Sequence, residues 1–198
     1  MSHFSTLLTA ELSTLSNLSY SKKFKGVTYG WGSLTEYSNT YPSGLSVTSF
    51  KRGNDIVVSF RGTDSFSDLG ADSSFLTGQW NEQFQEAVKL IADLRRDNRG
   101  AHITLTGHSL GGGIAQVLAK MFRLDAMSFD APGAEAITRS AGYRKAEQEY
   151  AQGLQQQEPG HIVNYVSRRS LVSSVGTHIG EKLPLEPLGA SVSSITII

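Results

Sequence analysis

The sequence predicts an α/β fold in which a mainly parallel sheet carries helices on both faces. Apolar runs of strand length alternate with helical patterns along the 198 residues, and one strand pattern passes through a glycine-rich turn directly into a helix. Strands that alternate with helices are typical of parallel sheets. No internal repeat, linker or low-complexity segment divides the chain, so residues 1–198 are expected to form one domain.

The composition excludes several classes of protein. Lys and Arg (18) balance Asp and Glu (18), so there is no basic field that would hold a nucleic acid. The absence of cysteine rules out disulfides, thiolate metal sites and a cysteine nucleophile. No window reaches the roughly 18 consecutive apolar residues of a membrane span, and the N-terminus lacks the pattern of a secretory signal. We therefore expect a cytoplasmic protein, or one exported by a signal-independent route.

The first half of the chain contains two helical patterns and a pair of strands. Leucines at helical spacing behind a capping serine predict a helix from Ser5 to Leu18. The stretch "GLSVTSFKRGNDIVVSFRGTD" predicts two strands around the turn "RGND", the second running from Ile56 to Phe60. Apolar residues then repeat with a period near 3.6 from Gln79 to Asp97, which predicts an amphipathic helix that ends at "DNRG".

The second half continues the alternation. A short strand, "HITLT", leads into the glycine-rich turn and a helix from about Gly111 to Phe122. "AMSFDA" predicts the next strand, "YRKAEQEYAQGLQQQ" a mostly polar helix and "HIVNYV" a further strand.

The turn itself, "GHSLGGG", matches the G-x-S-x-G pattern of a nucleophile elbow. In such an elbow a serine lies in a strained turn after a strand, and flanking glycines, here Gly107 and Gly111, let strand and helix approach closely. Ser109 is the candidate nucleophile, and the N–H of Leu110 at the helix start is the expected donor to an oxyanion. The alternative is a glycine-rich turn with an incidental serine.

Together, "IVVSFRGTDSFSDLGAD" and "ITLTGHSLGGGIAQVLA" resemble the class 3 lipase family over about Ile56 to Gly133. The resemblance implies an α/β-hydrolase fold and a serine hydrolase that cleaves carboxylic esters, with lipid esters as the expected substrates, without a cofactor or metal. It also implies that Thr63 supplies the second oxyanion-hole group. Residues 64–76 occupy the place of the family's lid, although an ordinary surface loop is an equal alternative.

A serine nucleophile needs a general base, and the chain has five histidines. His102 and His161 begin strands, at the opposite edge of the sheet from the serine, and His3 precedes the fold. His108 lies inside the elbow, where the family resemblance implies that it packs structurally. His178, in the loop "SSVGTHIGEK" beyond the "HIVNYV" strand, is therefore the candidate base. An ordinary surface histidine is the alternative for this position.

The carboxylate that orients the histidine is harder to assign. Class 3 lipases have an aspartate after the strand equivalent to "HIVNYV", but that position here is Ser170. Asp130 ends the "AMSFDA" strand at the correct edge, and pancreatic-type lipases are similar in having their acid there. Asp130 is thus the candidate acid, with capping of the "APG" turn as the equal alternative. Ser170 could also mark an inactivated relative that binds an acyl ligand or a protein partner.

Two further patterns are weaker indications of a bound ligand. Asp64, Asp68 and Asp72 suggest calcium, but they lack the glycine and closing glutamate of an EF-hand loop, so capping is the better interpretation. The arginines of "SRRS" could attract a phospholipid headgroup, or simply be solvated. The expected partners are a lipid or small ester substrate and a transient lipid surface.

Overall fold

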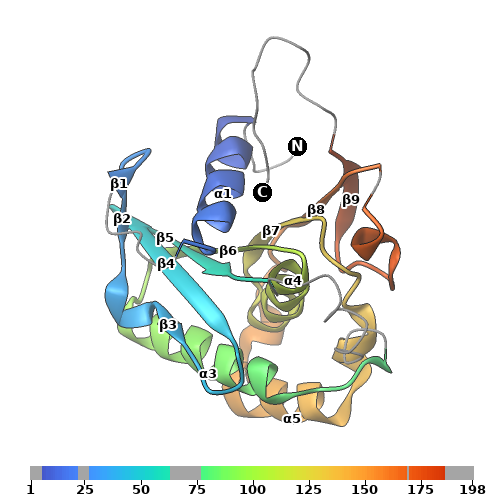
Figure 1. Cartoon of the computed structure of the whole chain (residues 1–198). Helices are drawn as coiled ribbons and strands as arrows, with labels where there is room; N and C mark the ends of the chain where they lie inside the picture. The colour runs from blue at the N-terminus through green and yellow to red at the C-terminus, as the bar shows by residue number, and fades with distance from the viewer. Residues whose placement is uncertain (1–5, 22–26, 63–76, 169, 186–198) are drawn as a thin grey trace.

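A mixed sheet runs through the centre of the computed structural model, which describes residues 6–21, 27–62, 77–168 and 170–185 (Figure 1). Within these residues nine strands pair in the order β1-β2-β4-β5-β6-β7-β8-β9, with β3 added to β4. The strands are β1 (Val27–Thr28), β2 (Trp31–Ser33), β3 (Asn39–Thr40), β4 (Ser46–Arg52), β5 (Asp55–Phe60), β6 (His102–His108), β7 (Asp125–Phe129), β8 (Ile162–Val166) and β9 (Glu181–Pro184). The α-helices are α1 (Thr6–Leu18), α3 (Glu82–Asp97), α4 (Leu110–Phe122) and α5 (Ala141–Tyr150).

The sheet changes character at β5. Strands β4 and β5 form the predicted antiparallel hairpin, with Arg52 opposite Asp55 across the turn. From β5 to β9 every neighbouring pair is parallel. The carboxyl ends of β5 to β8 therefore lie at one edge of the sheet, the edge at which α/β proteins bind their ligands.

Helices cover both faces of this sheet, as the sequence predicts. Helix α1 packs on one face, and α4, flanked by α3 and α5, packs on the other (Figure 1). The alternation of side chains along β5 divides its apolar residues between the two layers. Val57 joins the cluster of Leu12 and Leu15 from α1, whereas Ile56 and Val58 join the larger cluster around α4.

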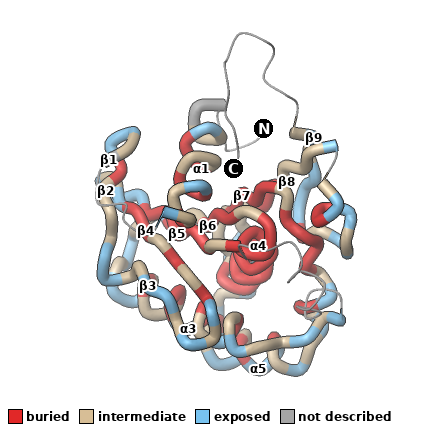
Figure 2. The backbone as a smooth tube through the Cα atoms, viewed as in Figure 1, coloured by how far each residue is buried: buried red, intermediate tan, exposed pale blue. Residues whose placement is uncertain are grey.

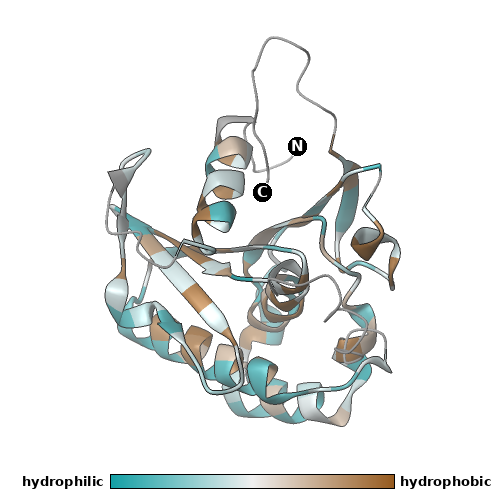
Figure 3. Ribbon diagram, in the orientation of Figure 1, coloured by the Kyte–Doolittle hydropathy of each residue, from teal (hydrophilic) through white to brown (hydrophobic). Residues whose placement is uncertain are grey.

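Helix α4 is the most buried element of the fold. Apart from Lys120, each of its residues is buried, and Figure 2 shows the helix as a nearly continuous buried segment. Helices α3 and α5 instead each have buried apolar residues on one side and polar residues on the other (Figure 3). This difference explains why the α4 sequence is apolar all round while the α3 sequence is amphipathic.

Helix α1 is also fixed by a polar contact. Glu11 is only 6% exposed and forms an ion pair with Arg52 of β4, with 3.1 Å between Arg52 Nη2 and Glu11 Oε2. The Arg52 guanidinium lies over the ring of Trp31, 4.3 Å from the ring centroid. The contact joins α1 to the antiparallel half of the sheet.

Some boundaries differ from those predicted. Helix α3 begins at Glu82 rather than Gln79, because the Asn81 side chain accepts the N–H of Phe84 and caps the helix there. The polar helix spans Ala141–Tyr150 and continues only as a short 3-10 turn, Leu154–Gln156. Strands β1, β2, β3 and β9 have no counterpart among the predicted elements, since each has four residues or fewer.

Several predictions fall outside the described residues. These are the Ser5 cap, His3, Thr63, and the lid segment with its three aspartates at 64–76. Among the helices that are described, none is long and apolar enough to cross a membrane.

A buried glutamine connects α4 to the two loops beside it. Gln116 is fully buried; its Nε2 donates to the Pro132 carbonyl at 3.0 Å, and its Oε1 accepts the Ile179 N–H at 3.0 Å. Asn164 of β8 continues the network, because its Nδ2 donates to the carbonyls of Ile179 and Glu181. The loop after β7 and the loop that carries His178 are thus held together by buried amides.

We expect Gln116→Met to lower the free energy of unfolding by about 2–4 kcal/mol, because the Ile179 N–H and the Pro132 carbonyl would stay buried without partners. Guanidinium titration followed by circular dichroism measures this loss. Gln148→Met, on the exposed side of α5, is the control and should change the value by less than about 0.5 kcal/mol. Equal stability of the two variants would contradict the role given to Gln116.

Candidate active site

Ser109 lies in the turn between β6 and α4 and has a strained backbone. Its φ of 54° and ψ of −131° are rare for a residue with a side chain. Its N–H donates to the Phe129 carbonyl at 3.0 Å, and its carbonyl accepts the Gly112 N–H at 3.0 Å. The residue is 6% exposed. Strain held by bonds on both sides is the geometry of a nucleophile elbow.

The flanking glycines allow strand and helix to touch. A Cβ on Gly107 would lie 2.5 Å from the Gly111 carbonyl carbon, and one on Gly111 would lie 2.1 Å from the Phe60 carbonyl oxygen. Neither position has room for a side chain. Helix α4 therefore begins directly on the backbone of β5 and β6, with Leu110 in its first turn, where backbone N–H groups have no acceptor within the helix.

The end of β5 lies against the elbow. A Cβ on Gly62 would come within 2.7 Å of the His108 carbonyl oxygen and 3.2 Å of Ser109 Cβ. Gly62 directly precedes Thr63, the candidate second oxyanion donor. The structure thus brings the end of the strand that precedes Thr63 into contact with the turn of Ser109.

A cavity of about 290 Å³ opens at this carboxyl edge. Two candidate residues, Ser109 and Asp130, line it, as does Ser170 at the family's acid position. The remaining wall consists of His108, Ser167, Leu171 and Val172. Leu171 is 73% exposed, which makes it one of the two large apolar side chains that are exposed within the described residues. One cavity therefore combines the serine, a carboxylate and an apolar rim.

Asp130 directly follows β7 and also has a positive φ, 45°. Its N–H donates to the Tyr165 carbonyl at 2.8 Å, and its Oδ1 accepts the Ser167 N–H at 2.7 Å. The carboxylate thus joins the ends of β7 and β8 across 37 residues, which differs from the predicted local cap of the "APG" turn, and it also lines the cavity of Ser109.

Ser170 caps a short turn. Its Oγ accepts the N–H of Ser173 at 3.2 Å, at the start of the 3-10 helix Val172–Ser174. The family's acid position therefore lies on the cavity wall, where the hydroxyl has a local structural partner.

His178 is held beside the loop after β7. Its Nε2 is 3.0 Å from the carbonyl oxygen of Ala131. A carbonyl only accepts, so Nε2 is the protonated nitrogen and Nδ1 of the neutral ring is left able to accept a proton. Burial lowers the pKa of His178 below 6.5; the bond to Ala131 raises it, and the charge of Lys182 lowers it further. His178 is not among the described residues that line the cavity.

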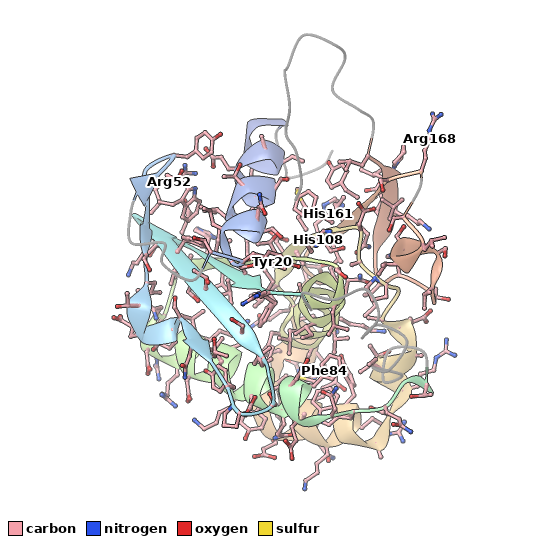
Figure 4. The ribbon with its side chains drawn as sticks, viewed as in Figure 1. Tyr20, Arg52, Phe84, His108, His161 and Arg168 are labelled. Carbon is pink, nitrogen blue, oxygen red and sulfur yellow. The ribbon has the colours of Figure 1, made fainter. Side chains whose placement is uncertain are left out.

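His108 has a more specific environment than sequence reasoning anticipated. Its Nδ1 is 3.1 Å from the hydroxyl of Tyr20, which confirms structural packing, yet the residue also lines the cavity. Burial lowers the pKa of His108, while the Asp130 carboxylate raises it. Tyr20 had no sequence signal, because 88 residues separate it from its partner. Figure 4 shows the two labelled side chains close together above α4.

The remaining described histidines lie where the sequence placed them. His102 begins β6, paired with Asp55, and His161 directly precedes β8, with its Nε2 3.7 Å from Glu181 Oε2. Both are at the amino edge of the sheet. In the described residues there is no cluster of three or more His, Asp or Glu side chains that could hold a metal ion.

Comparison with known structures supports the same fold. The chain is similar to a Rhizomucor miehei lipase (16% identity, TM-score 0.55), covering 85% of this chain and 63% of that one. It is also similar to lipase II of Rhizopus niveus (14%, 0.55; 85% and 75% covered) and to a triacylglycerol lipase of Penicillium expansum (12%, 0.55; 88% and 77% covered). The protein thus spans less than two thirds of the Rhizomucor chain.

No curated protein sequence matches the chain significantly. A family model does match: the Tle-like phospholipase domain, over residues 18–186. That range includes both strands of the hairpin, the elbow, Asp130 and His178. The chain therefore belongs to the family of Tle-like phospholipase domains and has the α/β-hydrolase fold of class 3 lipases.

Proposed function

We propose that the protein hydrolyses carboxylic esters of lipids through an acyl-enzyme on Ser109. The observation that carries this proposal is the strained turn of Ser109 at the wall of a cavity that also contains a carboxylate and an exposed leucine. A backbone held in a rare conformation at a cavity indicates a functional constraint. The phospholipase family supports an ester substrate.

In the proposed reaction, Ser109 Oγ attacks the ester carbonyl carbon while His178 accepts the hydroxyl proton. The N–H groups of Leu110 and Thr63 stabilise the oxyanion of the tetrahedral intermediate. The intermediate collapses, the C–O bond to the alcohol breaks, and His178 returns the proton to the departing oxygen. Water then attacks the acyl-enzyme by the same route and releases the fatty acid. No cofactor or metal takes part.

We further propose that His178 is oriented in two ways. The Ala131 carbonyl accepts its Nε2–H, which selects the tautomer with a basic Nδ1. Asp130, which directly precedes Ala131 in the chain, provides the negative charge that favours the imidazolium of His178 during the reaction. Ser170 carries no charge and leaves this role to Asp130.

The residues at the rim of the cavity favour lipid esters as the substrates. Leu171 and Val172 offer an apolar wall to an acyl chain, and Arg168 directly follows Ser167 of that wall. Figure 4 shows the Arg168 side chain extending away from the fold. An exposed cation beside an apolar rim suits an anionic phospholipid headgroup. The related solved structures are lipases, which supports the same class of substrate.

The nucleophile is tested with a fluorophosphonate probe, which forms a covalent bond with an activated serine. We expect the wild type to be labelled and Ser109→Ala to lose both labelling and ester hydrolysis. Ser59→Ala is the matched control, because the Ser59 hydroxyl is buried on β5 and has no hydrogen-bond partner among the described residues. A folded wild type that stays unlabelled would contradict the proposed hydrolase activity. It would favour the alternative of an inactivated relative that binds an acyl ligand.

The acid is tested by two substitutions at the cavity wall. Asp130→Asn keeps an oxygen for the Ser167 N–H but removes the charge, so we expect kcat for p-nitrophenyl esters to fall roughly 10²–10⁴-fold. Ser170→Asp should give little gain. If Asp130→Asn keeps the wild-type rate and Ser170→Asp raises it strongly, the acid belongs at position 170 instead.

The base is tested by the pH dependence of kcat/KM. His178 must be neutral to accept the serine proton, so activity is lost as pH falls through its pKa. Since burial lowers that pKa, we expect the acidic limb of the profile below pH 6.5. Lys182→Gln removes a charge that lowers the pKa and should move the limb to higher pH. A limb that does not respond to Lys182→Gln would not belong to His178.

A further inference from the structure

We propose that Tyr20 is a positioning residue, whose hydroxyl fixes the oxyanion-hole strand to the nucleophile elbow by bonding both Gly62 and His108. This proposal rests on the proposed function of Ser109. Tyr20 lies two residues after α1, and neither the family's motifs nor the elbow pattern include it.

The hydroxyl has two hydrogen-bond partners at equal distance. The N–H of Gly62 donates to the Tyr20 oxygen at 3.1 Å, and the Tyr20 oxygen is 3.1 Å from His108 Nδ1. Gly62 precedes Thr63, the oxyanion donor, and His108 precedes Ser109, the nucleophile. A single oxygen atom therefore joins the residues next to the two groups that must act on the same carbonyl.

The protons of this bridge can be assigned. The Tyr20 oxygen accepts the Gly62 N–H, and we assign the Tyr20 proton to the bond with His108 Nδ1. His108 is then neutral and carries its proton on Nε2. The burial that lowers the pKa of His108 favours this uncharged state. The bridge thus orders two backbone segments and one imidazole tautomer.

The bridge also decides which backbone groups remain for catalysis. The Gly62 N–H is occupied by Tyr20 and is therefore not available to an oxyanion, a role that the proposed mechanism gives to Thr63. The fit is tight, since a Cβ on Gly62 would lie 2.6 Å from the Tyr20 hydroxyl and 3.2 Å from Ser109 Cβ. Loss of the hydroxyl would let this strand end move relative to Ser109.

The ring of Tyr20 has separate packing contacts. It meets the His108 ring edge to face, with 6.0 Å between centroids, and the Arg61 guanidinium lies 5.5 Å from its centroid. Phenylalanine keeps both contacts and loses only the bridge. The effect of the hydroxyl can therefore be measured apart from that of the ring.

The experiment compares Tyr20→Phe with Tyr37→Phe. Tyr37 donates to Asp97 at 2.7 Å, away from the cavity, so its loss also removes one tyrosine hydrogen bond. We expect Tyr20→Phe to lower kcat for p-nitrophenyl butyrate about 10–100-fold with KM changed less than about threefold, because small displacements of catalytic groups cost rate rather than binding. Tyr37→Phe should keep both values, and the melting temperatures of the two variants should be similar.

A two-bond ¹H–¹⁵N spectrum of wild-type protein with ¹⁵N-labelled histidine reads the tautomer directly and needs no variant to fold. We expect His108 as the Nε2–H form, becoming a mixture in Tyr20→Phe. A His108 with its proton on Nδ1, or a Tyr20→Phe variant with kcat within twofold of a reactive wild type, overturns the role of Tyr20 alone. A wild type that does not react with fluorophosphonate overturns the proposed function together with it.

Discussion

The approach of helix α4 to the backbone of β5 is the constraint on which the rest of the site depends. A Cβ at Gly111 would lie 2.1 Å from the Phe60 carbonyl oxygen, so only glycine fits at this position in the first turn of the helix. Ser109, two residues before this contact, has a positive φ, and the first N–H groups of the helix have no acceptor within it. The candidate nucleophile and the expected oxyanion donor Leu110 therefore both lie beside that one contact between backbones.

Sequence reasoning located the elements whose patterns are local. The β4–β5 hairpin, α3, β6 and α4 were predicted because apolar periodicity and turn residues lie within a few positions of one another. Strands β1, β3 and β9 are too short to show alternation and are defined by their neighbours in the sheet. The edge of the sheet was predictable as well, since parallel strands share a direction, and Ser109 and Asp130 do meet at one cavity.

Contacts between distant segments could not be predicted in this way. Tyr20 reaches His108 across 88 residues, and Gln116 reaches Ile179 across 63. Neither residue belongs to a periodic pattern from which its partner could be identified. The same limit applies to His178: its loop was placed at the correct edge, but the bond of its Nε2 to the Ala131 carbonyl depends on how two loops pack. The bond between Asp130 and Ser167 likewise depends on which strands are neighbours in the sheet, and the residues next to Asp130 in the sequence do not determine this order.

Ser109 is supported from both faces of the sheet, and the two supports act on different groups. On the face covered by α1, Tyr20 bonds both Gly62 after β5 and His108 at the end of β6. On the opposite face, Gln116 of α4 fixes the loops that carry Ala131 and His178. In the proposed mechanism, a disturbance on the first face therefore changes the alignment of the oxyanion donors, whereas one on the second changes the position of His178. Because α1 is joined to the sheet through Glu11 and Arg52, movement of that helix would reach Gly62 and His108 without passing through His178.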